Sequence, residues 1–121
     1  MTASDFRRLA LELPEATEGS HMGHPDFRVG GKIFATLGHP NETLGMVKLS
    51  PEQQFDFVQV WPLVFEPVPG GWGRGGATHV RLSKASKTAV RKALMAAWRN
   101  RAPKKLSAKW GEAHNEPDSQ R

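Results

Sequence analysis

The chain has 121 residues, a formal net charge of +5 and no cysteine. This length fits one domain, since single domains cluster near about 100 to 150 residues. Without cysteine, disulfides and thiolate metal sites are excluded, which indicates a reducing compartment. Residues 1–8 contain Asp5 and no long apolar run, and no stretch approaches the ~18 apolar residues of a membrane span. We therefore expect a cytoplasmic protein without a signal peptide or membrane segment.

The first elements along the chain are a helix and a run of short strands. Apolar residues recur at helical spacing at Phe6, Leu9, Ala10 and Leu13. Ser4 is the expected N-cap of this helix, and Pro14 stops it. Over residues 15–49 the apolar period becomes two, which predicts short antiparallel strands. Residues 30–31, two glycines, signal a tight hairpin, and residues 38–41 signal a looser turn.

A second helix is predicted after these strands, followed by two more strands. Ser50 is a good N-cap, Pro51 suits the first helical position, and Gln53 can complete a capping box. This helix should run to about residue 60. Strands are expected over residues 63–68 and 77–82, on either side of a glycine-dense loop.

The last main helix begins after the N-cap Ser86 and is closed by Pro103. Its apolar stripe comprises Val90, Ala93, Leu94, Ala97 and Trp98. Strands grouped between helices predict an α+β fold, with an antiparallel sheet packed by helices on one side. We expect one domain over residues 1–110 and a polar, disordered tail over residues 111–121.

Basic charge is concentrated in one segment of the chain. Residues 1–66 hold five Lys or Arg against nine Asp or Glu, whereas residues 67–110 hold eleven Lys or Arg and no acidic residue. A one-signed block attracts polyanions, of which nucleic acid is the commonest. The alternative is that these cations solvate a face, or that the acidic half folds against them and cancels the field. The complete absence of acids favours a binding face, because solvating surfaces usually mix both signs.

Two parts of this segment are candidate contacts to DNA. Residues 70–76 contain five glycines, so we expect a wing at a hairpin tip where Trp72 stacks on a base and Arg74 reaches a phosphate. In the alternative, Trp72 folds back onto the core. The loop lacks the lysine and spacing of a P-loop, so nucleotide hydrolysis is not supported. With the cationic edge of the last helix, the predicted nucleic-acid contacts are Trp72, Arg74, Arg81, Lys84, Lys87, Arg91 and Lys92.

Two blocks of sequence are typical of a known family. The first is LPEATE at residues 13–18, leading to HPDFRVGGKIFA at residues 24–35. The second runs from VFEP at residues 64–67 through GWGRGGAT at residues 71–78 to the last helix. With these blocks, nearly all of residues 4–106 resembles the MmcQ/YjbR family, small bacterial proteins with a CyaY-like α+β fold. The resemblance implies DNA binding through a double-wing arrangement of β-hairpins, and it carries over no catalytic residues.

The sequence departs from this family at Ala77, where members often place an aromatic residue. Candidate metal ligands are His21, His24, His39, Glu18 and Asp26, but their spacing is not that of a convergent site. Frataxins share the fold and need a dense acidic ridge on the first helix, which instead carries Arg7 and Arg8. No nucleophile elbow is present.

We therefore predict a non-enzymatic DNA-binding protein with no cofactor, no metal, no small-molecule substrate and, by default, a monomeric state. The first alternative is a protein-interaction module that presents the same basic face to an acidic partner. The second is a frataxin-like metal-handling protein.

Overall fold

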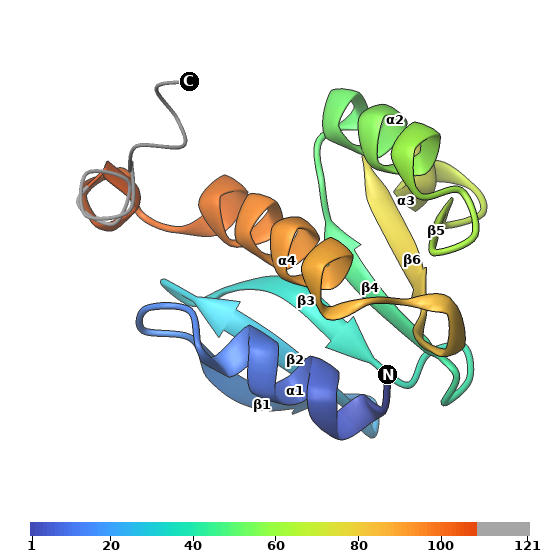
Figure 1. Ribbon diagram of the computed structural model, residues 1–121. Coiled ribbons are helices and arrows are strands. Elements are labelled where there is room, and N and C mark those ends of the chain that lie inside the picture. The colour runs from blue at the N-terminus through green and yellow to red at the C-terminus, as the bar shows by residue number, and fades with distance from the viewer. Residues whose placement is uncertain (109–121) are drawn as a thin grey trace.

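The computed structural model describes residues 1–108 of the chain. These residues form a six-stranded antiparallel sheet with helices, in the strand order β1-β2-β3-β4-β6-β5, and confirm the predicted α+β fold class (Figure 1). The strands are β1 Thr17–His21, β2 His24–Val29, β3 Lys32–Leu37, β4 Leu44–Lys48, β5 Phe65–Pro67 and β6 Ala77–Arg81. The helices are α1 Ala3–Leu11, α2 Pro51–Val60, α3 Gly71–Arg74 and α4 Lys87–Arg101, with the 3₁₀ turn η1 Leu82–Lys84. The predicted tail, residues 111–121, lies outside the described residues.

The start of α1 differs from the prediction by two residues. Thr2 is the N-cap, and Ser4 already lies inside the helix. The Thr2 hydroxyl accepts a hydrogen bond from the Asp5 backbone N–H at 3.1 Å, and the Asp5 carboxylate accepts one from the Thr2 N–H at 3.0 Å. This reciprocal capping box needs an acid or amide three residues after the cap. Thr2 has Asp5 there, whereas Ser4 has Arg7, and this difference selects Thr2.

The other local predictions between the first and last helices are largely confirmed. The strands expected over residues 15–49 form β1 to β4, and the pairing of Val29 with Lys32 closes the hairpin at the two glycines. Ser50 caps α2, and Gln53 completes its capping box. The Ser86 hydroxyl caps α4 by accepting a hydrogen bond from the Ala89 N–H at 3.2 Å.

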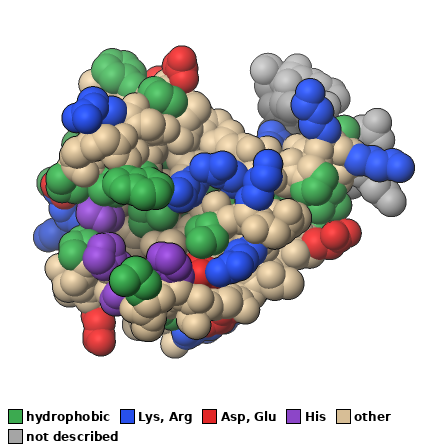
Figure 2. Space-filling model, turned by 180° about the vertical axis from the view of Figure 1, so that it is seen from behind, with side chains coloured by type: hydrophobic (Ala, Val, Ile, Leu, Met, Phe, Trp, Pro, Cys, Tyr) green, Lys and Arg blue, Asp and Glu red, His purple; other side chains and the backbone are tan. Residues whose placement is uncertain are grey.

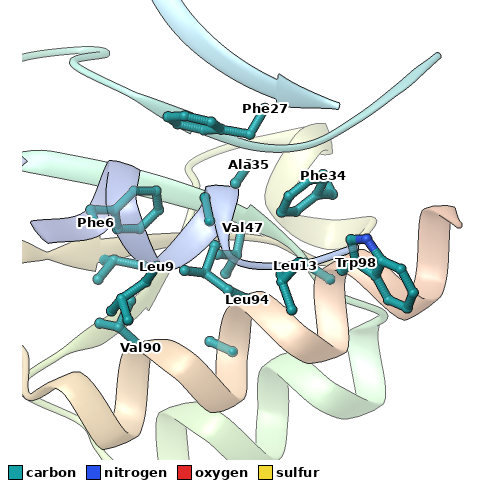
Figure 3. Packing of buried hydrophobic residues seen from close by; sticks show 14 of the residues in the cluster. Phe6, Leu9, Leu13, Phe27, Phe34, Ala35, Val47, Val90, Leu94 and Trp98 are labelled. Carbon is teal, nitrogen blue, oxygen red and sulfur yellow. The ribbon is translucent and has the colours of Figure 1, made fainter. Parts of the chain in front are cut away.

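The hydrophobic core lies between one face of the sheet and the helices α1 and α4, which lie side by side across that face (Figure 1). The predicted apolar stripe of α4 is buried, and Trp98 is its largest member. The Trp98 indole Nε1–H donates to the carbonyl oxygen of Pro14 at 3.0 Å, which satisfies its buried polar atom. Figure 3 shows how side chains of the two helices and the sheet converge: Phe6, Leu9, Val90, Leu94, Phe27, Phe34 and Val47.

The opposite face of the sheet, which we call the open face, is defined by the alternation along each strand. On β4, Val47 is fully buried toward the helices, so its neighbours Met46 and Lys48 point to the open face and are partly exposed. On β6, Val80 likewise points to the core, and His79 points to the open face. The chemistry of this face is therefore set by side chains that do not contribute to the core.

The glycine-dense segment is not a projecting wing. It joins β5 to β6, as a hairpin connection should, but residues 71–74 form the one-turn helix α3 packed against the rest of the chain. A Cβ at Gly73 would lie 1.7 Å from the carbonyl oxygen of Val68, and a Cβ at Gly76 would lie 1.9 Å from that of Leu49. These two glycines therefore allow close approach of the chain to itself rather than to a ligand.

Candidate functional site

The cations that sequence reasoning selected on α4 lie beside acidic residues of α1. Arg91 Nη2 is 3.9 Å from a carboxylate oxygen of Glu12. The pKa of Asp5 is lowered first by its hydrogen bonds to Thr2 and further by the positive charges of Arg8 and Lys87. Lys87 and Arg91, which we call the helical basic region, thus face negative charge. Across these helices the acidic half of the chain does fold against the basic half.

Three other predicted DNA contacts, Arg81, Lys84 and Lys92, lie outside the helical basic region. Arg81, on the open face, forms an ion pair with Glu66 and donates hydrogen bonds to the backbone oxygens of Pro62 and Leu63 at 3.3 and 3.2 Å. Its guanidinium therefore ties β6 to the segment before β5. Lys84 in η1 and Lys92 on α4 are exposed, and neither forms an ion pair with another described residue.

Trp72 is the predicted contact whose position is most unusual. Its side chain is 70% exposed and does not fold into the core, because α3 holds it at the border of the open face. Gln54 fixes this segment, since its Nε2 donates to the carbonyl oxygens of Gly73 and Ala77 at 3.0 Å each. Arg74 follows one residue after Gly73 and is exposed. A large exposed indole on a fixed support is available to stack on a ligand.

Trp72 meets two cations that the sequence did not single out. Lys48 Nζ lies 4.5 Å from the centroid of the indole ring. A hollow of about 450 Å³ is lined by Lys48, Trp72 and Arg101, the last residue of α4. Burial lowers the pKa of Lys48, and the positive charge of Arg101 lowers it further. We call Lys48 and Arg101, together with the ring of Trp72, the groove basic region.

This pair of cations has no carboxylate partner within residues 1–108. The Arg101 Nε atom is buried and has no hydrogen-bond acceptor there. The two side chains are brought together by Asn100, whose Nδ2 donates to the Lys48 carbonyl oxygen at 3.0 Å and to Gln53 Oε1 at 2.8 Å. By contrast, Arg28 on the same face is neutralised by Asp26, with Nε and Oδ1 2.8 Å apart.

An apolar groove adjoins this cationic hollow on the open face. Its volume is also about 450 Å³, and the two share Lys48, Trp72 and Ala77. The lining is mostly apolar, with Met22, Pro25, Ile33, Met46 and Val68. Figure 2 shows this face, where the histidines gather with hydrophobic side chains and a row of Lys and Arg runs beside them.

Four histidines also line the groove: His21, His24, His39 and His79. The rings of His24 and His39 are 5.1 Å apart at their centroids. His79 is 8% exposed, and burial lowers its pKa, which keeps the ring neutral at pH 7. Among residues 1–108, no three His, Cys, Asp or Glu side chains are placed to hold a metal ion together.

Lys48 was missed because it lies in the acidic half of the chain, outside the basic segment. The two-residue period that predicts β4 does place Met46 and Lys48 on the face opposite Val47, so the signal for its orientation was present. Arg101 was counted in the basic segment but not among the contacts. Arg101 and Lys48 are 53 positions apart in the sequence, and no local pattern predicts that they lie close together.

None of the helices in the described part of the chain is long and apolar enough to cross a membrane. The fold and the groove define a small α+β protein with a single-sheet scaffold, one face covered by helices and the other carrying a cationic hollow beside an apolar groove. The chain belongs to the YjbR family, whose model matches residues 11–100. The resemblance drawn from the sequence is thereby confirmed.

Among solved structures, the chain is similar to the crystal structure of Deinococcus radiodurans protein DR2400, described as a DUF419 domain. The two are 19% identical with a TM-score of 0.67, and the match covers 97% of this chain and 90% of that chain. At this identity the likeness supports the fold alone. No curated protein matches the sequence.

Proposed function

We propose that this protein is a non-catalytic DNA-binding protein whose main phosphate contacts are Lys48 and Arg101, with Trp72 beside them. The observation that carries the proposal is the cationic pair itself. Two positive groups held at one hollow repel each other, and no described carboxylate offsets that repulsion. An anion bound between them would remove the repulsion and give the buried Arg101 Nε an acceptor.

Further exposed cations lie on two segments that contact this region. The first segment is α3, which lines the hollow and carries Arg74. The second segment follows Arg101, where Pro103 packs against the β2–β3 turn so closely that a Cβ at Gly30 would lie 2.9 Å from Pro103 Cδ. Three exposed lysines lie within two residues of Gly30 or Pro103 along the chain: Lys32, Lys104 and Lys105. A polyanion with evenly spaced phosphates fits such a series of cations better than a single small anion does.

The double-wing arrangement implied by the family resemblance would then consist of two hairpins that flank Arg101. One is β2–β3, whose turn contacts Pro103, and the other is β5–β6, whose connection is packed against the chain as α3, so that this hairpin would contact DNA without a projecting tip. Lys84 and Lys92 would add long-range attraction without fixed contacts. In this proposal Arg81, Lys87 and Arg91 contribute little, because each already lies near a carboxylate or is held by one.

The test is a salt-dependent titration of a labelled DNA oligonucleotide with three proteins. They are the wild type, the variant Lys48→Ala/Arg101→Gln and the control variant Lys87→Ala/Arg91→Ala. Both variants lose two positive charges, so their net charges match. We expect the groove variant to bind about tenfold more weakly or worse, with the slope of log K against log salt reduced by about 1.5, since each lost phosphate contact removes about 0.7–0.9.

The control variant should stay within about threefold of the wild type, as expected for charges that act only at long range. Wild-type binding that is absent or indifferent to salt would reject the proposal. Equal weakening of both variants would reject the assignment of the site. Poly-glutamate competing as well as DNA of equal charge would favour the acidic-partner alternative, because that polymer has the charges and no bases.

A further inference from the structure

We infer that the apolar groove receives an unpaired nucleobase, so that the preferred ligand is single-stranded nucleic acid. The inference rests on the proposed function and deepens it. Its starting point is that the cationic hollow and the groove are contiguous, because Lys48, Trp72 and Ala77 line both. A strand whose phosphate lies between Lys48 and Arg101 therefore has the indole and the groove within reach of its nearest base.

The groove has the size and chemistry that a base requires. Its volume of about 450 Å³ falls in the range of about 300–1,000 Å³ typical of small-ligand sites. Its lining includes apolar side chains of the strands, such as Ile33 and Met46, together with Val68 and the exposed ring of Trp72. A phosphate backbone alone would leave these apolar surfaces in contact with water. A base stacked on the indole would cover them.

Polar atoms are also available for the edge of a base. Thr36 and His79 lie in the lining, and the lowered pKa of His79 leaves the imidazole neutral, with one nitrogen as donor and the other as acceptor. A few polar groups in an apolar lining fix the orientation of a ligand.

Duplex DNA cannot present a base to this groove without flipping it out of the stack, which costs free energy that a single strand does not have to supply. A mononucleotide would fill the groove but would leave the cations beyond the hollow, such as Arg74 and Lys104, without a phosphate. Charge complementarity and the apolar lining together favour a strand with exposed bases over both.

The experiment compares four probes of defined chemistry at one salt concentration. They are a single-stranded DNA 12-mer, the same 12-mer in duplex form, an abasic 12-mer with the same phosphates and no bases, and a mononucleotide. We expect the single strand to bind at least about tenfold more tightly than the duplex or the abasic strand, given the usual contribution of one stacked base. The NMR signal of the Trp72 indole N–H should shift only with probes that carry accessible bases.

Three variants assign the effect to the ring of Trp72. Trp72→Leu should weaken single-strand binding about tenfold and leave duplex binding within threefold, because it removes stacking and no charge. Trp72→Phe should restore most of the preference. Phe55→Leu is the matched control, since Phe55 is 63% exposed on α2 and does not line the groove. Both sites of change, Trp72 and Phe55, are exposed, so the fold should be retained.

The outcomes separate this inference from the proposed function. Equal, salt-dependent binding of the single strand, the duplex and the abasic strand would overturn the base pocket and leave the phosphate site standing. A mononucleotide that binds as tightly as the 12-mer would reassign the groove to a small ligand. Binding of none of the four probes would overturn both proposals.

Discussion

The helical basic region and the groove basic region differ in what surrounds their charges more than in the charges themselves. Arg91 and Arg101 lie on the same helix, yet Arg91 faces Glu12 of α1, whereas Arg101 faces Lys48 and an exposed indole. A block of positive residues along the chain is therefore not one binding surface. The field at each place depends on which acids tertiary packing brings close.

The two regions also differ in the role of their basic residues, which compensate nearby acids in one region and remain uncompensated in the other. In the helical basic region, Lys87 and Arg91 offset the negative charges of Asp5 and Glu12 at the two ends of α1. In the groove basic region, the uncompensated pair is a local cost to stability that a bound anion would relieve. Residues that remain electrostatically unfavourable in the free protein are candidates for function.

The largest expected effect on stability comes from a substitution in α3, the helix that carries Trp72. Gly73→Ala should lower the free energy of unfolding by about 1–3 kcal/mol, because its Cβ would meet the backbone oxygen of Val68 at 1.7 Å and α3 would have to shift. DNA binding through the groove basic region should weaken with it. Denaturant unfolding and DNA titration of the same variant measure both effects.

Gly75→Ala is the control for this variant. The nearest atom to a Cβ at Gly75 is the Trp72 backbone oxygen at 3.5 Å, and the φ of Gly75 is −84°, so alanine fits there. Its effect should stay within about 0.5 kcal/mol. If the two variants were equally destabilised, the close approach at Gly73 would not be what positions α3.

A second prediction concerns the pKa of Lys48, followed by NMR of its side chain. In the free protein this pKa lies below the usual lysine value, mainly because of burial and also because of Arg101. Arg101→Gln should move it back toward that value. DNA binding should raise it, since a nearby phosphate favours the charged amine.

Because DNA binding should raise the pKa of Lys48, the affinity for DNA should depend on pH. Affinity for DNA should fall as the pH rises through the lowered pKa of free Lys48, because the neutral amine no longer attracts phosphate. An unchanged Lys48 pKa at saturating DNA would contradict a phosphate contact at this side chain.

The smallest expected effect is in the helical basic region. Arg91→Ala should change the free energy of unfolding by less than about 0.5 kcal/mol, since Arg91 and Glu12 are about half exposed and 3.9 Å apart. A thermal double-mutant cycle with Glu12→Ala measures the coupling. A coupling well above about 1 kcal/mol would show that this ion pair stabilises the fold more than exposed pairs usually do.

Local chemistry was sufficient for much of the fold. Ser50 and Gln53 cap α2 from positions three residues apart, and Gly30 and Gly31 close the β2–β3 hairpin. The start of α1 was missed although Asp5 stands three residues after Thr2, so that signal was also local. The bounds of β5 were overestimated, since the strand spans only residues 65–67, although the backbones of Val64 and Val68 still form hydrogen bonds with those of Arg81 and Ala77.

The site depended on contacts that no local pattern contains. From the sequence alone, the glycines at 73 and 76 predict a flexible loop. In the structure their backbones lie directly against Val68 and Leu49, which leaves no room for a side chain. The predicted stacking residue Trp72 is indeed exposed at the groove, but its role there stays a prediction.

By itself the sequence determined the class of fold, the order of its elements and the family, because caps, turns and apolar periods act over a few residues. Only the tertiary structure decided which positive charges are neutralised. The packing of α4 against α1 places Arg91 near Glu12, and the Asn100 contacts to β4 and α2 place Arg101 near Lys48. Coulomb interactions depend on distance in space, and distance along the chain does not specify it.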